Sequence, residues 1–278
     1  MTSKGCPYDC EFCSVHPVCG FKWRQFSVTR VLTEIEDLFN NYHVSHIEIE
    51  DDNFTSDNKR TIQILDGLIY RNKSNFPISW SAPNGIRIDT LNEEIIHKIK
   101  ESNCKHINIA LEHGNKDVLS LMNKKLDLEK VVTIIKLLKI YKISTGIFII
   151  FGYPGETRER FINALELYKE IKIIKPDIGF AFFLPQPYPK TKLFMRCVKE
   201  GYLPDNYFSD ISDIKLMSSD KLWIETPDFN KKEILRRKKI LHKTLDTPKS
   251  IKRVIYENTP DFICSLYQFS KKLLFKTK

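Results

Sequence analysis

Three cysteines lie within eight residues near the amino terminus of this 278-residue chain, in the segment Cys6-Pro-Tyr-Asp-Cys10-Glu-Phe-Cys13. Thiolates this close in sequence can share one inorganic centre, and soft thiolates select zinc or iron–sulfur clusters. A structural zinc site normally has a fourth protein ligand, for which this region offers only Cys19 or His16. We therefore favour a cluster with one iron open to an exogenous ligand, and a zinc site is the alternative.

The Cys-x3-Cys-x2-Cys spacing, with Phe12 directly before the last cysteine, resembles the radical S-adenosylmethionine (SAM) superfamily. The resemblance implies that Cys6, Cys10 and Cys13 hold a [4Fe-4S] cluster whose fourth iron binds the amino and carboxylate groups of SAM. It also implies that the Phe12 segment lies against the adenine. Such an enzyme would act on a small-molecule substrate and would need an electron donor such as a flavodoxin or ferredoxin.

The composition of the chain indicates a soluble protein in a reducing compartment. The chain is 42% hydrophobic and 28% charged, which is ordinary for a soluble globular protein. Its longest apolar run, residues 147–151, is far shorter than the roughly 20 residues that a membrane span requires. Seven cysteines without a signal peptide favour a reducing compartment and metal binding over disulfides. We expect a cytoplasmic protein of an anaerobe or microaerophile, because an exposed cluster iron is sensitive to oxygen.

The positive charge is concentrated in the last quarter of the chain. Residues 1–202 carry 28 basic and 25 acidic residues, whereas residues 203–278 carry 16 and 10. Lysines outnumber arginines 33 to 11, and a surface that reads phosphates would favour arginine. We therefore do not expect nucleic acid as a partner.

Strand, loop and helix alternate along the chain at intervals of about 30 to 40 residues, as in a parallel sheet. We predict strands at 44–50, 77–82, 106–111, 144–151 and 178–184, with a stub at 1–4 as a sixth strand. Helices are predicted at 28–39, 57–71, from a capping box at Thr90–Glu93, and at 117–140, 157–174 and 190–200. A full eight-stranded barrel takes about 250 residues. The pattern therefore predicts an α/β fold, a partial (βα)6 TIM-like barrel with parallel strands over residues 1–202.

Residues 203–278 form the predicted second region. Residues 203–228 have the composition of an irregular connection or lid. Amphipathic basic helices are predicted at 231–245 and 260–274, so the barrel would carry a helical C-terminal extension that packs against it.

One predicted strand has polar residues at alternate positions, namely His46, Glu48, Glu50 and Asp52. Buried parallel strands are usually apolar throughout. The pattern fits either an exposed edge strand or a polar barrel lumen. We favour the lumen, because the acids recur at the carboxyl end of the strand, where barrel enzymes keep their chemistry.

Several strand ends resemble the superfamily branch that contains methylthiotransferases and cobalamin-dependent enzymes. The matching segments are Asp51-Asp-Asn-Phe54, Asn84-Gly-Ile-Arg87, Glu112, and Phe151-Gly-Tyr-Pro-Gly-Glu-Thr157. The resemblance implies that Glu112 contacts the ribose or amino group of SAM and that Asn84 and Arg87 are further SAM contacts. It also implies that Gly152, Gly155 and Glu156 shape the wall near the methionine part.

Two features depart from that branch. The sixth loop reads Pro187-Tyr-Pro-Lys190-Thr191, where the branch often has a glycine in place of Lys190. Cys19 is not one of the usual cluster ligands, and we interpret it as structural, with a radical relay or auxiliary ligand as the alternative.

The branch resemblance suggests methyl transfer to an unactivated atom. It implies cobalamin from a missing or separate domain or protein, because no Asp-x-His-x-x-Gly signature occurs in the chain. Within the enzyme class the alternative is cobalamin-independent hydrogen abstraction or rearrangement. Outside it, the alternative is a non-catalytic zinc- or RNA-binding module.

Overall fold

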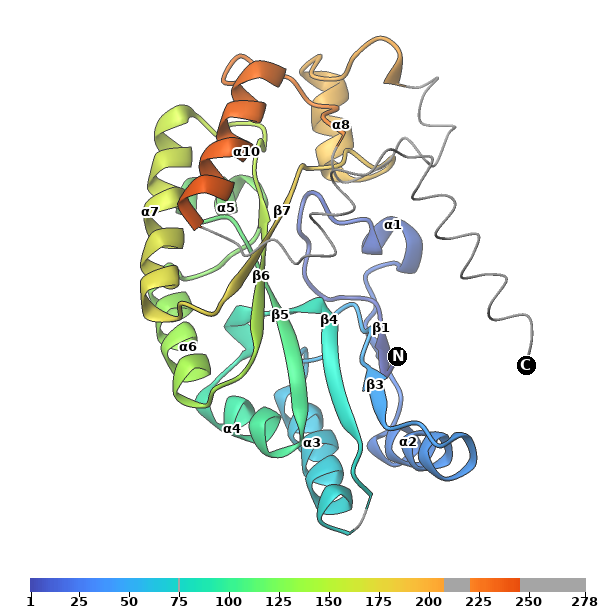
Figure 1. The fold of residues 1–278 in the computed structure, drawn as a ribbon. Helices are drawn as coiled ribbons and strands as arrows, with labels where there is room; N and C mark the ends of the chain where they lie inside the picture. Colours follow the sequence, from blue (N-terminus) through green and yellow to red (C-terminus); the bar gives the residue numbers. More distant parts are fainter. Residues whose placement is uncertain (75, 208–220, 246–278) are drawn as a thin grey trace, which may run out of the picture. The chain divides into compact units, whose positions relative to one another are not determined.

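A five-stranded, all-parallel sheet forms the centre of the computed structural model, which describes residues 1–74, 76–207 and 221–245. The strands stand in the sheet in the same order as in the chain (Figure 1). They are β3 (His46–Glu48), β4 (Ser79–Arg87), β5 (Cys104–Glu112), β6 (Thr145–Ile150) and β7 (Gly179–Phe183). An unbroken parallel order of this kind is that of a partial barrel, so the predicted fold class is confirmed.

One layer of helices covers one face of this sheet. Its neighbours in contact run in the order α2 (Val28–Tyr42), α3 (Asn58–Lys73), α4 (Glu93–Glu101), α6 (Leu128–Ile140), α7 (Arg158–Ile174) and α10 (Lys231–Leu245). Most begin at a side chain that accepts a hydrogen bond from the first turn, as at Ser27, Asp57 and Thr157. The core lies between these helices and the sheet, where Ile107, Ile109, Ile147 and Ile149 are fully buried.

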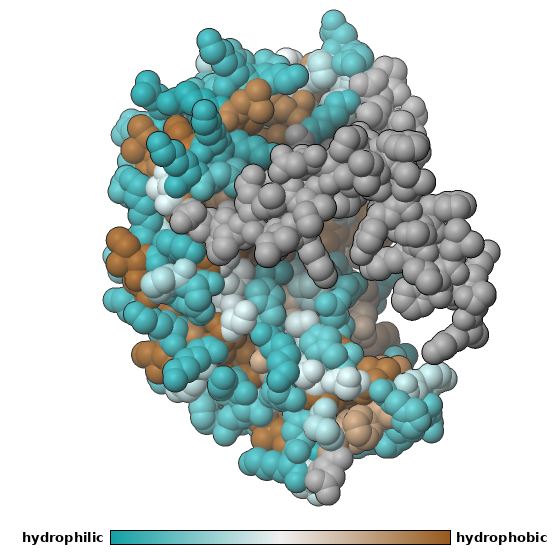
Figure 2. All heavy atoms as spheres, viewed as in Figure 1, coloured by the Kyte–Doolittle hydropathy of each residue, from teal (hydrophilic) through white to brown (hydrophobic). Residues whose placement is uncertain are grey.

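Hydrophilic side chains cover most of the visible face of the described residues (Figure 2). Within these described ranges, none of the helices combines the length and the apolar character needed to cross a membrane.

Three sequence predictions about elements are wrong. The stub β1 (Ser3–Lys4) pairs antiparallel with β2 (Arg24–Gln25) and does not join the parallel sheet. Thr90 does not cap α4, because it ends a 3-10 turn, η1 (Ile88–Thr90), and donates its hydroxyl to the Arg87 carbonyl at 2.6 Å.

The cap of α4 is Asn92, whose side chain accepts from the Ile95 amide. The third error is the long helix predicted at 117–140. It is two helices, α5 (Lys116–Leu121) and α6, separated by residues 122–127.

Of the two interpretations of the polar strand, the edge strand is the one that the structure supports. Among the described strands, β3 lies at one edge of the parallel sheet, and Glu48 and Glu50 are exposed. His46, however, lies across β4, with its ring nitrogens 2.9 Å from Ser79 Oγ and 3.0 Å from Ser81 Oγ. β3 is therefore an edge strand, and the His46 side chain links it to β4.

Helix α10 belongs to the barrel layer. Met1–Leu245 form one compact unit, so the domain boundary predicted at residue 202 falls inside this unit. The predicted helix at 231–245 is confirmed, and the one predicted at 260–274 lies outside the described residues. In Figure 1, α10 runs beside α7, and the two helices are in contact.

Arg237 fastens α10 to the barrel. Its guanidinium is fully buried, donates to the Glu156 carbonyl at 2.9 Å and lies 3.5 Å from the Glu156 carboxylate. On its own helix it donates to Glu233 at 3.1 Å. A buried carboxylate that loses its cation is left uncompensated in a medium of low polarity.

We predict that Arg237→Met lowers the free energy of unfolding by about 3 to 5 kcal/mol. Arg236→Met is the matched control, because Arg236 stands next to it on α10 but is 45% exposed and pairs with Glu233 of its own helix. Chemical denaturation of both variants measures the difference. Equal losses for the two substitutions would contradict the anchoring role of Arg237.

Candidate active site

A cavity of about 290 Å³ opens where β4 and β5 end, at the carboxyl edge of the sheet. All three clustered cysteines line it, together with Phe12, Asn84, Arg87 and Glu112, which the sequence analysis gave as candidate SAM contacts. The lining residues are Cys6, Tyr8, Cys10, Phe12, Cys13, Val15, Asp52, Asn53, Asn84, Gly85, Arg87, Ala110, Glu112 and Lys124. Segments that are far apart in the sequence therefore meet at one site.

The cysteine loop is held by its first residue and by an internal turn. Gly5 has φ 87°, and a Cβ there would lie 2.5 Å from the Lys22 carbonyl oxygen, so only glycine fits. The Gly5 amide donates to the Asp52 carboxylate at 2.7 Å. Within the loop, the Cys13 amide donates to the Cys10 carbonyl at 3.2 Å. These contacts fix where the loop begins and how it turns between two thiols.

Two amide or guanidinium groups approach the thiols. Asn53 Nδ2 lies 3.9 Å from the sulfur of Cys6, and Arg87 Nη1 lies 3.9 Å from the sulfur of Cys10.

Burial raises the pKa of Cys13 to about 11 and also raises the pKa of Cys10. Both groups are therefore protonated thiols at neutral pH, and a metal must displace their protons to bind.

Glu112 and Lys124 form a buried ion pair on the wall of the cavity. Lys124 Nζ lies 3.0 Å from Glu112 Oε1 and donates to the Ala110 carbonyl at 2.5 Å. Glu112 is a non-glycine residue with φ 69°, and the β5–β6 register shifts between Ala110 and Glu112. Such irregularities re-aim side chains and cluster at functional sites.

Lys124 is the principal site residue that the sequence analysis missed. It lies in the segment between α5 and α6, which we predicted to be helical. The available signals were Asn123, which adopts φ 51°, and Asp127, which caps α6. Asparagine tolerates the left-handed conformation better than most residues, so it can end a helix.

The register of β4 also shifts near the cavity, between Ala82 and Ile86. This irregular stretch carries exposed Asn84 and also Gly85, which has φ 93°. Arg87, at the end of the strand, is buried and pairs with Asp89 at 2.7 Å. Its guanidinium also lies over the Tyr8 ring, 3.8 Å from the centroid.

The remaining predicted residues, Gly152, Gly155 and Glu156, do not line this cavity. Glu156 is fully buried and accepts from the amides of Gly152 and Tyr153. Its carboxylate lies 3.3 Å from His113 Nε2. That these residues shape the methionine side of a SAM site stays a prediction.

The ligands considered for a zinc site are not arranged around one ion. His16 Nε2 lies 3.0 Å from the Cys6 carbonyl oxygen, and Nδ1 lies 3.6 Å from Asp9. Cys19, at the end of α1 (Val15–Cys19), is not among the lining residues. In the described part of the chain, no three His, Cys, Asp or Glu side chains converge to hold a single metal ion. Thiolates that each bind a different iron of a cluster do not need such convergence.

The sixth loop keeps a left-handed residue although it lacks the glycine. Lys190 has φ 67°, and Thr191 after it caps α8 (Lys192–Lys199). The lysine therefore adopts the conformation that a glycine would take there more easily.

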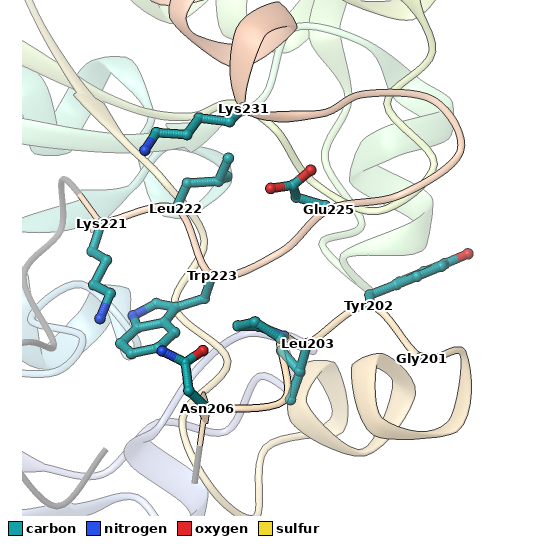
Figure 3. Close-up of a pocket in the computed structure, with 10 residues that line it drawn as sticks. Gly201, Tyr202, Leu203, Asn206, Lys221, Leu222, Trp223, Glu225 and Lys231 are labelled. Atoms are coloured by element: carbon teal, nitrogen blue, oxygen red, sulfur yellow. The ribbon is translucent and has the colours of Figure 1, made fainter. Parts of the chain in front are cut away.

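A second cavity, of about 340 Å³, lies beyond the end of α8 (Figure 3). Residues 201–204 and 221–223 contribute to it, and the Lys221 ammonium lies 3.6 Å from the centre of the Trp223 ring. It contains no cysteine among its lining residues. The chemistry that the thiols can support therefore belongs to the first cavity.

Comparisons with known proteins identify the family. Residues 1–168 match the radical SAM superfamily. The chain is 33% identical over 205 residues to an uncharacterized methyltransferase of Pyrococcus horikoshii, covering 73% of this chain and 42% of that protein. It is 27% identical over 212 residues to the cytidylyl-2-hydroxyethylphosphonate methyltransferase of Streptomyces wedmorensis, covering 73% of this chain and 38% of that protein.

Among solved structures, the chain resembles the radical SAM methyltransferase TsrM of Kitasatospora setae, determined with cobalamin and a [4Fe-4S] cluster bound. The TM-score is 0.61 at 19% identity, over 71% of this chain and 38% of that one. At this identity the likeness shows the fold alone. The chain therefore belongs to the radical SAM superfamily, and it spans less than half the length of these relatives.

We predict that alanine at Cys6, Cys10 or Cys13 abolishes cluster assembly, because each sulfur would bind a separate iron. Cys197→Ala is the matched control, since Cys197 is buried in α8 and does not line the cavity. Iron and sulfide analysis after anaerobic reconstitution distinguishes the variants. Stoichiometric zinc in place of iron, or full iron in Cys10→Ala, would contradict the assignment.

Proposed function

We propose that this chain is the core of a radical SAM enzyme that transfers a methyl group to an unactivated atom of a small-molecule substrate. One observation carries the proposal. Three thiols and a buried acid–base pair face the same cavity at the carboxyl edge of a parallel sheet. Barrel enzymes carry their chemistry at that edge.

The donor set fits an iron–sulfur cluster with SAM beside it. Cys6, Cys10 and Cys13 would hold the cluster, with Asn53 and Arg87 near two of the sulfurs. When bound, a reduced [4Fe-4S] cluster supplies the electron that splits SAM into methionine and a 5′-deoxyadenosyl radical. The protein contributes position and electrostatics.

The Lys124–Glu112 pair offers one cation and one anion to the methionine end of SAM, which carries an amino group and a carboxylate. The cation and the anion lie 3.0 Å apart on the cavity wall. The cation can pair with the carboxylate, and the anion can accept a hydrogen bond from the amino group, which is neutral when its nitrogen binds iron. We assign the SAM carboxylate to Lys124 and the SAM amino group to Glu112, with Phe12 as an apolar neighbour of the adenine.

Methyl transfer is supported by the relatives that are named methyltransferases. We propose that cobalamin comes from a separate domain or protein. The described residues contain one parallel sheet, and its cavity is the radical SAM site proposed above. A reduced flavodoxin or ferredoxin would supply the electron.

Anaerobic reconstitution tests this function. The reduced protein is given SAM carrying a deuterated methyl group, with and without added hydroxocobalamin. We expect one SAM to give methionine and 5′-deoxyadenosine. A second SAM should pass its deuterated methyl group to the added cobalamin, once excess reductant has brought it to cob(I)alamin, and leave S-adenosylhomocysteine. Cleavage without any label transfer would favour the cobalamin-independent hydrogen abstraction or rearrangement. A cluster that forms but never cleaves SAM would overturn the proposal.

We predict that Lys124→Met weakens SAM binding by about 10- to 100-fold, because Glu112 and the SAM carboxylate both lose their cation. Lys125→Met is the control, since Lys125 is exposed and is not among the lining residues. Equilibrium binding of SAM to the reconstituted variants measures the effect. Equal affinities would exclude Lys124 as a ligand.

A further inference from the structure

We propose that Tyr153 is a positioning residue for the cluster, acting through Glu11 to hold the loop between Cys10 and Cys13. The inference rests on the cluster role proposed for these cysteines and adds residues that do not line the cavity. It gives the Gly152–Glu156 segment a role different from the methionine wall predicted above.

Glu11 is the anchor of the cysteine loop. It stands directly after Cys10, and its backbone amide donates to the Met122 carbonyl at 2.9 Å. Its carbonyl accepts from the Leu193 amide of α8 at 2.9 Å. Its carboxylate lies 3.5 Å from the Arg196 guanidinium of the same helix. The loop is therefore fixed from two separate elements through one residue.

Tyr153 supplies a further contact to this carboxylate. Its hydroxyl donates to Glu11 Oε2 at 2.5 Å, and its side chain is fully buried. A hydrogen bond from a neutral donor to a carboxylate is stronger than one between neutral groups, and burial strengthens it further. Because 142 residues separate the partners in sequence, the bond ties the β6–α7 connection to the amino-terminal loop.

The backbone of Tyr153 is itself immobilised. Glu156 accepts from the Gly152 and Tyr153 amides and is bound in turn by Arg237 of α10. A continuous chain of contacts thus runs from α10 to the cysteine loop. Glu156, which the family resemblance placed at the wall near the methionine part of SAM, is an internal support in this series of contacts.

This arrangement matters for the chemistry because the environment of cluster sulfurs sets the reduction potential. A shift of the loop at Glu11 moves the neighbouring Cys10. It therefore alters the distance between the Cys10 sulfur and Arg87 Nη1, which is 3.9 Å in this structure. Small displacements of a reacting group change rates by large factors. Tyr153 would therefore affect both the spectrum and the reactivity of the cluster without touching it.

The test compares Tyr153→Phe with wild type by two readouts. In the cluster-free chain, hydrogen exchange of the peptide containing Glu11 and Cys13 should accelerate at least about tenfold, because the loop loses a tether. In the reconstituted chain, the electron paramagnetic resonance spectrum of the reduced cluster should shift, and SAM cleavage should fall by about 10- to 100-fold. Iron content should remain close to that of wild type.

Two further variants keep the test decisive. Tyr207→Phe is the control, because it removes another buried hydroxyl, whose acceptor is the Pro187 carbonyl at 2.5 Å. Glu11→Leu removes the acceptor instead of the donor and should reproduce the effect. The double variant should add little to Glu11→Leu, because Glu11→Leu has already removed the bond to Tyr153.

The inference is overturned if loop exchange and the cluster spectrum are unchanged in Tyr153→Phe, or if Tyr207→Phe changes them equally. Should Tyr153→Phe fail to fold, Glu11→Leu carries the same comparison. The exchange readout does not need a cluster. Failure of wild type to assemble one would therefore count against the proposed function and leave the positioning result intact.

Discussion

The site depends on a single constraint, namely that three thiols must face one cavity from a loop that has almost no regular structure of its own. Ordering such a loop costs conformational entropy, which contacts to its surroundings must offset. Gly5 is bound by Asp52, in the connection after β3, and Glu11 is bound by Met122, α8 and Tyr153. The barrel therefore acts as the frame that holds the thiols, and its strand ends supply the other groups of the cavity.

This constraint explains why the carboxyl ends of β4 and β5 are irregular. In a regular strand the side chains would go on pointing to alternate faces of the sheet past the cavity. The register shifts instead place Asn84, Gly85 and Glu112 on the cavity lining, with Glu112 and Gly85 in left-handed conformations. Lys124 completes the wall from a connection between two short helices. The charged pair and the thiols thus come from different βα units, and no single segment forms the site.

The sequence predicted the parts of the site whose positions follow from strand order. Asn84, Arg87 and Glu112 each end a predicted strand or follow it, and parallel strands bring such ends to one edge. Lys124 was missed because its place depends on where a helix breaks. Asn123 there donates to the Asp9 carbonyl, 114 residues away in sequence, and no local pattern reveals that contact. Glu156 also follows a strand, but it is buried against Arg237, 81 residues later in the sequence, and does not line the cavity.

The central claim is that the cavity brings a [4Fe-4S] cluster and SAM into direct contact. Electron–nuclear double resonance of the reduced, reconstituted chain with SAM labelled with ¹⁵N at its amino group tests this claim most directly. The account predicts a ¹⁵N coupling to the cluster in wild type and its loss or marked weakening in Glu112→Gln. A reduced cluster with bound SAM but no ¹⁵N coupling would contradict it.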